Sequence, residues 1–179
     1  MHWIFKAYRS ALHRHPVIVQ AIQTGILVSA GDAISQVVVE KKNLKTANYK
    51  RTVQYFCVGA IYLGPVLTVW YKVLHKYVGA EGKWYGLKKV ALDQLGFAPF
   101  GIAGFVISSC VFQGHTFQET KKKMIEVYPD ILKANYKLWP AVQLINFYLM
   151  PLHYQVLYAQ VVALFWNTYV CYKTKPDDV

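Results

Sequence analysis

The chain has 179 residues, of which 55% are hydrophobic, and its mean hydropathy is +0.21. A small soluble domain carries fewer apolar residues, so this composition predicts an integral membrane protein. The formal net charge is +11, but the basic residues are spread over all connecting segments without a zinc-finger, recognition-helix or RNP-like pattern, which argues against nucleic-acid binding. Basic segments beside apolar spans favour contact with anionic lipid headgroups, for example those of cardiolipin.

The amino-terminal residues 1–14 are basic and contain no acidic residue. Lys6, Arg9 and Arg14 supply the charge, while Ile4 and Leu12 fall on one face at helical spacing. This pattern predicts an amphipathic helix. Two roles stay open for it: a helix that lies on the membrane surface, or a signal for mitochondrial import.

Four stretches with almost no charged residues follow along the chain. A helix needs roughly 20 apolar residues to cross a bilayer, so these stretches predict transmembrane helices near residues 16–39, 52–74, 90–113 and 139–172. The last stretch is longer than a hydrocarbon core of ~30 Å requires, and we expect it to break near Pro151. The charged segment from Glu119 to Lys137 is expected to be a connecting loop.

These stretches define the expected fold class. We expect an all-α protein, an integral membrane bundle of four transmembrane helices with an N-terminal amphipathic helix, forming a single membrane domain over residues 1–179. Lysine and arginine residues divide equally between the two sides of such a bundle. The positive-inside rule therefore does not decide the orientation of the chain in the membrane.

Polar and small residues recur at helical spacing within the predicted spans. Asp32 and Gln36 share a stripe in the first span, Asp93 begins a face of the third span that continues through Gly101 and Gly104, and the last span repeats a polar residue every seven positions. Such faces either pack helices together through hydrogen bonds or line a polar lumen, and both interpretations stay open. The candidates for lining or gating a pore are Asp32, Gln36, Asp93, Gln94, Asn146 and His153.

The two aspartates within the spans each need a partner, a proton or water. A centrally placed acid that faces lipid costs about 2.5 to 3.5 kcal/mol. Asp32 comes near the end of the first span and Asp93 near the start of the third, which runs in the same direction, so the two lie at opposite leaflets. They are not expected to form a general acid/base pair. The ion-pair candidates are Arg51 for Asp32 and Lys72 for Asp93.

Each later span contains a proline, and Pro65, Pro99 and Pro151 are the candidates for helix breaks. Proline removes one backbone hydrogen bond from a helix. Interrupted helices occur at membrane depth where the backbone is buried in protein or lines a cavity. A simple kink that serves packing is the alternative interpretation.

The sequence contains no motif for catalysis, cofactor binding or metal binding. It lacks a nucleophile-elbow motif, a phosphate-binding loop and paired histidine ligands, so an enzyme is not expected. Cys57, Cys110 and Cys171 lie far apart in the sequence. This spacing favours packing over metal binding and leaves redox sensing as a second interpretation.

A set of short motifs is distributed along most of the chain. They include Gly31-Asp32, Gly64-Pro65, Asp93-Gln94, Trp139-Pro140-Ala141-Val142-Gln143 and Pro151-Leu152-His153-Tyr154. These motifs resemble the Mpv/PMP family of mitochondrial and peroxisomal four-span membrane proteins, and the likeness extends from Tyr8 to Lys173. Within that family the chain is most similar to the mitochondrial inner-membrane member linked to mitochondrial DNA maintenance. It departs from the family at Gln155, where arginine is usual, and at Val170-Cys171, where Leu-Ser is usual.

The resemblance implies a location and a function. It implies a multi-pass protein of the mitochondrial inner membrane, or alternatively of the peroxisomal membrane, that forms a weakly selective channel for small solutes. The channel would support mitochondrial homeostasis, reactive-oxygen balance and mitochondrial DNA maintenance. The rival interpretation is a non-conducting membrane scaffold whose polar faces pack helices or recruit partners. The expected partners are membrane lipid, small solutes or metabolites, and further copies of the chain or a larger inner-membrane complex; no cofactor is expected.

Overall fold

The computed structural model describes residues 10–11, 14–78, 84–150 and 152–176, apart from the side chains of residues 147 and 152–157. All regular secondary structure within these residues is helical, which confirms the all-α class. The predicted amphipathic helix over residues 1–14 lies mostly outside the described residues. Pro151 and the side chain of His153 also lie outside them.

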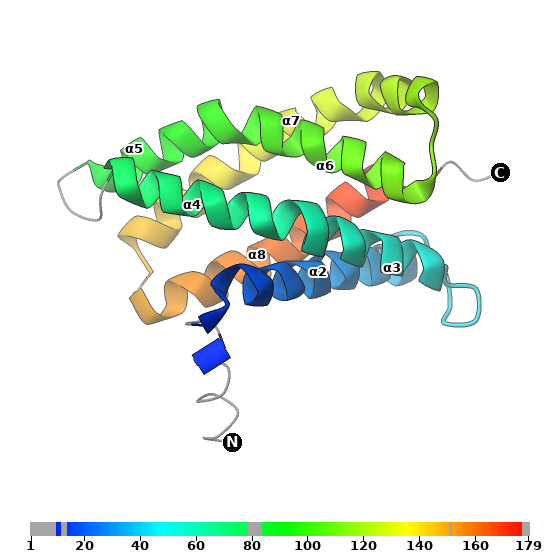
Figure 1. Ribbon diagram of the computed structural model, residues 1–179, viewed down its shortest axis with the longest axis horizontal. Coiled ribbons are helices and arrows are strands. Elements are labelled where there is room, and N and C mark those ends of the chain that lie inside the picture. Colours follow the sequence, from blue (N-terminus) through cyan, green and yellow to red (C-terminus); the bar gives the residue numbers. More distant parts are fainter. Residues whose placement is uncertain (1–9, 12–13, 79–83, 151, 177–179) are drawn as a thin grey trace.

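Five long helical segments follow one another within the described residues (Figure 1). The first is α2 (Pro16–Ile34) with η1 (Ser35–Val39), in which η marks a π-helical turn. The second consists of α3 (Tyr49–Cys57), η2 (Val58–Leu63) and α4 (Gly64–Val78), and the third of α5 (Tyr85–Ala91), η3 (Leu92–Phe97) and α6 (Ala98–Gln113). The last two are α7 (Phe117–Tyr148) and α8 (Leu152–Lys173).

Three of these segments are long and apolar enough to cross a membrane, namely Pro16–Val39, Tyr49–Val78 and Tyr85–Gln113. They coincide with the first three predicted spans, while the count of four spans stays a prediction. Large apolar side chains such as Ile26, Phe100 and Val111 are exposed on the outside of these segments. Exposed apolar side chains on long apolar helices are what a lipid environment requires.

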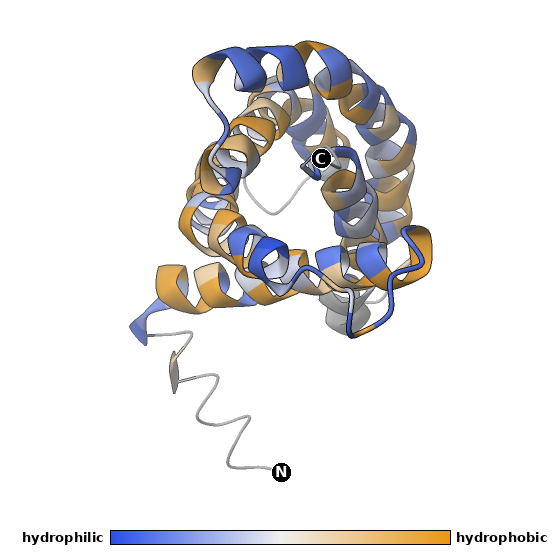
Figure 2. Ribbon diagram, turned by 90° about the vertical axis from the view of Figure 1, so that its right-hand side faces the viewer, coloured by the Kyte–Doolittle hydropathy of each residue, from blue (hydrophilic) through white to orange (hydrophobic). Residues whose placement is uncertain are grey.

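The segments pack around a common axis. α2 packs against α8 on one side and against α3, η2 and α4 on the other, while α6 packs against α7 and η2. Viewed from one end, the helices form a ring (Figure 2). The close approach of α2 to the second segment depends on glycine, since a Cβ added to Gly64 would lie 2.6 Å from the Cα of Ala21.

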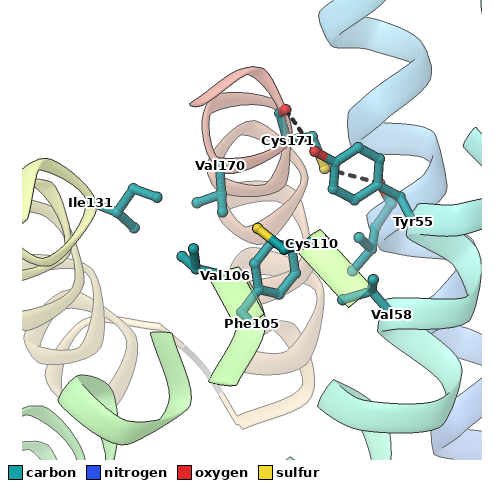
Figure 3. Packing of buried hydrophobic residues seen from close by; sticks show 9 residues of the cluster. Tyr55, Val58, Phe105, Val106, Cys110, Ile131, Val170 and Cys171 are labelled. Carbon is teal, nitrogen blue, oxygen red and sulfur yellow. Dashed lines mark hydrogen bonds between the residues drawn. The ribbon is translucent and has the colours of Figure 1, made fainter. Parts of the chain in front are cut away.

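A hydrophobic cluster fills the ring at one level (Figure 3). Its buried members come from α2, α3, η2, α6, α7 and α8 and are Val28, Tyr55, Val58, Phe105, Val106, Cys110, Ile131, Val170 and Cys171. Two of the three cysteines are thus part of the core, and Cys57 is partly buried. No disulfide joins the three thiols.

The charged segment from Glu119 to Lys137 is helical, which corrects the expectation of a loop there. It belongs to α7, which begins with a capping box: the Thr116 hydroxyl accepts from the Glu119 N–H, and the Glu119 carboxylate accepts from the Thr116 N–H. A capping box satisfies free N–H groups at a helix start. α7 runs without interruption into the start of the predicted last span and ends at Tyr148, and α8 begins at Leu152. The helical path therefore breaks between Tyr148 and Leu152.

Pro65 and Pro99 do not break their helices, because a π-helical turn precedes each of them. η2 ends directly before Gly64-Pro65, and η3 ends directly before Ala98-Pro99. The Gly64 N–H bonds to the Gly59 carbonyl, and the Ala98 N–H bonds to the Asp93 carbonyl, each five residues back. This wider turn changes the position of the carbonyl that a proline ring would otherwise meet. Both helices consequently continue past the proline.

Replacing Gly64 by alanine should destabilise the bundle. The added methyl group meets the backbone of α2, and overpacking of this kind costs about 1–3 kcal/mol. Gly96→Ala is the matched control, because the nearest atom to its added Cβ is Trp70 Cη2 at 3.9 Å. Thermal unfolding in detergent should show a lower Tm for Gly64→Ala than for Gly96→Ala. Equal Tm values would contradict the close packing of α2 on α4.

Candidate functional site

A buried network of charged side chains lies at the carboxyl-terminal end of the first helical segment. Asp32 is 0% exposed and Arg51, from the first turn of α3, is 2% exposed. Arg51 Nε donates to Asp32 Oδ1 at 2.7 Å, and its two terminal nitrogens donate to the Glu40 carboxylate at 3.0 and 2.6 Å. One guanidinium thus holds two carboxylates, one within a candidate span and one just after it. The structure brings together Asp32 and Arg51, which the sequence selects as partners.

Neutral side chains complete the network around Asp32. Asp32 Oδ2 accepts from Thr52 Oγ1 at 2.7 Å and from Gln36 Nε2 at 2.8 Å. Gln36 Oε1 in turn accepts from the Asn48 N–H at 2.6 Å, and the Asn48 side chain caps α3 by accepting from the Arg51 N–H. Both oxygens of Asp32 are therefore hydrogen-bonded within protein. Among the described residues, Asp32 and Gln36 serve to join α2 to α3 and do not line the cavity described next.

A cavity of about 870 Å³ lies inside the bundle. Its walls come from α2, η2, α4, η3, α6, α7 and α8, and the buried polar side chains in them are Gln94, Asn135, Gln143, Asn146 and Asn167. Of the sequence-predicted pore residues, the structure places Asp93, Gln94 and Asn146 in these walls. A volume in the range of about 300–1,000 Å³ suits small-molecule ligands.

Asp93 is held by neutral donors. Trp70 Nε1 donates to Asp93 Oδ1 at 2.9 Å, and Gln94 Nε2 donates to Asp93 Oδ2 at 2.9 Å. Asn135 Nδ2 extends this series of hydrogen bonds by donating to Gln94 Oε1 at 2.7 Å. Lys72 lies in the cavity wall and is exposed, and no ion pair joins it to Asp93 within the part of the chain that the structure describes. The expected Lys72–Asp93 pair is therefore replaced by hydrogen bonds from an indole and an amide.

The two ends of the cavity differ in chemistry. At one end, Phe105, Ile131 and Val170 belong both to the cavity wall and to the hydrophobic cluster, so the cavity stops at that cluster (Figure 3). At the other end the wall includes exposed basic residues of the last turns of α4, namely Lys72, His75 and Lys76. The cavity is thus a vestibule with a basic rim and an apolar floor.

The functional role of several residues of this site has no clear signal in the sequence. Asn135 sits in a segment expected to be a loop, and Trp70 and Trp139 look like interface anchors because tryptophan is common at membrane surfaces. The helical periodicity of α7 places Asn135, Trp139 and Asn146 in the same cavity wall. Recognition of the capping box at Thr116 would have extended this helix and connected these positions.

Comparisons with known proteins place the sequence among named relatives. The sequence profile described as "Mpv17 / PMP22 family" matches residues 110–171. The chain is 40% identical over 170 residues to the mitochondrial inner membrane protein Mpv17 of Danio rerio, covering 95% of this chain and 96% of the relative. It is 42% identical to the protein of the same name from Homo sapiens, at 95% and 97% coverage, and 36% identical to Protein SYM1 of Gibberella zeae, at 91% and 93% coverage. No solved structure matches the chain.

Replacing Arg51 by methionine should strongly destabilise the protein. The change leaves the Asp32 carboxylate buried without a cation, and breaking a buried ion pair in this way costs about 3–5 kcal/mol. Lys50→Met is the matched control, since Lys50 precedes Arg51 and is exposed. Thermal unfolding in detergent should give a large drop in Tm for Arg51→Met and little change for Lys50→Met. Similar drops in both variants would contradict a structural role for the network.

Glu40 should make stability depend on pH. Burial acts to raise the pKa of Glu40, but hydrogen bonds and charges from Arg51 and Lys42 outweigh it and lower the pKa from 4.5 to about 2. Because the folded-state pKa is the lower one, the stabilising contribution is complete above about pH 4.5 and is lost between there and about pH 2. The Tm in detergent should fall over this window, and less steeply for Glu40→Gln. Glu126→Gln, at an exposed position, should keep the wild-type slope; an unchanged slope for Glu40→Gln would refute the assignment.

Proposed function

Since this chain belongs to the Mpv17 / PMP22 family and is a protein of the mitochondrial inner membrane, we propose that it forms a weakly selective channel for small solutes in that membrane. The relatives named above support the inner membrane over the peroxisomal alternative. The observation that carries the proposal is the cavity of about 870 Å³ inside a bundle of apolar helices. Helices that only anchor a protein do not require a cavity with buried polar side chains in its wall.

A fourth span completes the proposed channel. α8 has 22 residues, which at 1.5 Å per residue gives about 33 Å, close to the ~30 Å of a hydrocarbon core. It packs along α2 and supplies Gln160 and Asn167 to the cavity wall. The bundle would then consist of three apolar segments and α8, with α7 closing the ring between α6 and α8.

The hydrophobic cluster is the proposed gate. It separates the floor of the vestibule from the end of the bundle that carries Arg51, and its members Val28 and Val106 are completely buried. A constriction lined only by apolar side chains excludes water and ions until it widens or becomes wetted. The structure would correspond to a closed channel, and movement of α6 or α8 would open it.

Solute exchange through this channel is how we expect the chain to support mitochondrial homeostasis, reactive-oxygen balance and mitochondrial DNA maintenance. Exchange of metabolites across the inner membrane changes what the matrix has available for each of these processes. Direct contact with DNA is not part of the proposal, because the basic residues are distributed over the loops and are better suited to anionic lipid.

A non-conducting scaffold is the alternative, and the exposed face of α7 favours it. Lys122, Glu126, Asp130, Lys133 and Lys137 follow one another at helical spacing and are exposed. Asn135 on α7 contacts Gln94, which lies within the candidate span Tyr85–Gln113. Charged side chains at that depth are costly against lipid. A second copy of the chain or another inner-membrane protein would cover this face.

Replacing Val106 by threonine should make the proposed gate easier to open. Threonine has nearly the shape of valine but carries a hydroxyl, so it favours water within the constriction. We expect planar-bilayer recordings to show an open probability raised several-fold relative to the wild-type chain. Val111→Thr is the matched control, because it lies on the same helix and is 64% exposed on the outside.

The recordings also separate the two proposals. Conductance from the wild-type protein that Val106→Thr enhances and Val111→Thr leaves unchanged would support the channel and its gate. Absence of current from folded, inserted wild-type and Val106→Thr protein would refute the channel and favour the scaffold. Far-ultraviolet circular dichroism of the reconstituted protein establishes that each variant is folded.

A further inference from the structure

The vestibule is lined by a belt of buried carboxamide side chains from three helical segments. Gln94 comes from η3, Asn135, Gln143 and Asn146 come from α7, and Asn167 comes from α8; each is at most 9% exposed, and all five line the same cavity. We call this set the carboxamide belt. Every carboxamide offers both a donor and an acceptor and carries no charge. A wall of this kind matches a solute whose own groups both donate and accept hydrogen bonds.

The belt has an unused acceptor. Asn146 is 6% exposed, and its Oδ1 is buried with no hydrogen-bond partner within the described part of the structure. A buried carbonyl group without a hydrogen-bond partner destabilises the structure. The oxygen is closed off from the cavity as the side chain stands, so a hydroxyl group of a solute would donate to it after the Asn146 side chain rotates toward the cavity. Binding of such a solute would then give this oxygen the hydrogen-bond partner that it lacks among the described residues.

The charged residues of the cavity act against solutes of either sign. A cation that enters must pass the rim formed by Lys72, His75 and Lys76, and an anion that reaches the belt meets the carboxylate of Asp93. Each Asp93 oxygen already accepts one hydrogen bond, from Trp70 or from Gln94, so part of the acceptor capacity of this carboxylate is used within the protein. A neutral polar solute avoids both penalties, because desolvation of a neutral group costs far less than that of an ion.

Aromatic rings lie beside the belt. Trp139 and Trp166 both line the cavity, and their rings form an edge-to-face pair with centroids 6.3 Å apart. Phe97 lines it as well and stacks on Trp70. Flat apolar rings bury the carbon-bound hydrogens of a solute, while the carboxamides hydrogen-bond its polar groups. The two kinds of surface together fit a compact molecule that is apolar on its faces and polar around its edge.

We propose that the carboxamide belt binds neutral, hydroxyl-rich solutes of the size of a six-carbon polyol or sugar, and that these are the preferred solutes of the vestibule. This inference deepens the proposed channel function and rests on it. Binding to the belt raises the occupancy of the vestibule by such solutes, and multiple weak hydrogen bonds still permit release when the gate opens.

The test compares three solutes that share one carbon skeleton. Proteoliposomes containing the full chain, in the Val106→Thr form if the wild-type gate stays closed, are exposed to sorbitol, to gluconate or to glucamine, and entry is followed by stopped-flow light scattering. Sorbitol is neutral, gluconate carries a carboxylate and glucamine an ammonium group. We expect sorbitol to enter about five- to tenfold faster than either charged analogue, because the basic rim repels the ammonium group of glucamine and Asp93 repels the carboxylate of gluconate.

Two variants test the residues of the belt in the same channel background. Asn146→Leu should slow sorbitol entry by about fivefold to tenfold, which is a larger change than the one expected in its single-channel conductance for potassium chloride. Gln118→Leu is the matched control, because Gln118 is exposed at the start of α7 outside the cavity. Sorbitol should enter proteoliposomes that contain this variant at the parental rate. Circular dichroism and Tm in detergent establish that both variants fold.

The possible results separate this inference from the channel itself. If the protein conducts ions but sorbitol enters no faster than gluconate and glucamine, the preference for neutral solutes is overturned. The proposed channel function would still be supported in that case. Equal sorbitol rates for Asn146→Leu and Gln118→Leu would overturn the role of the belt. Absence of conductance and of all solute entry would overturn the proposed channel and, with it, this inference.

Discussion

The guanidinium of Arg51 is the constraint on which the arrangement of the helices depends. It lies 2% exposed between Asp32 and Glu40, and charges within a membrane protein are tolerated only when they are paired or solvated. Both carboxylates come from one end of the first segment, and Arg51 comes from the start of the second. The ion pairs of Arg51 with these two carboxylates fix the distance and the relative rotation of α2 and α3. The close glycine contacts of α2 with η2 and α4 follow from that starting position.

Once the Arg51 end is fixed, the two halves of the bundle differ in what fills them. Near Arg51 the space between the helices is occupied by the hydrophobic cluster and by the hydrogen bonds of Tyr55, whose hydroxyl contacts Thr174 Oγ1 at 2.9 Å and Cys171 O at 3.0 Å. Toward the end of α4 it is occupied by the cavity. Polar side chains are present in both halves. They bond to one another in both, and each half also holds a buried oxygen without a partner among the described residues, namely Gln113 Oε1 beside Tyr55 and Asn146 Oδ1 in the cavity wall.

The sequence predicts the partner of Asp32 but neither the partners of Asp93 nor the helix that completes the cavity wall. The order of the two aspartates along the spans was sufficient to select Arg51 as the partner of Asp32, because charge and depth in the membrane limit the choices. The same reasoning selected Lys72 for Asp93 and was wrong, since an indole N–H and an amide satisfy that carboxylate without a charge. The helix through Glu119–Lys137 was missed because charge was taken as a sign of a loop, although the pattern from Lys122 to Lys137 also fits one face of a helix. The cavity wall could not be assembled without that helix.

The π-helical turns change how the faces of these helices relate to one another. In a regular α-helix each residue turns the side-chain direction by about 100° around the helix axis. A π-helical turn contains one additional residue, which shifts the angular positions of all residues after it relative to those before it. The residues before η3 and those after it therefore follow two separate angular registers. A helical wheel drawn continuously from Asp93 through Gly101 and Gly104 joins two faces that belong to different registers. The second and third spans, in which such a turn lies between two α-helices, therefore each consist of two short helices. These helices can present independently chosen faces, one to lipid and one to the interior, along a single continuous backbone.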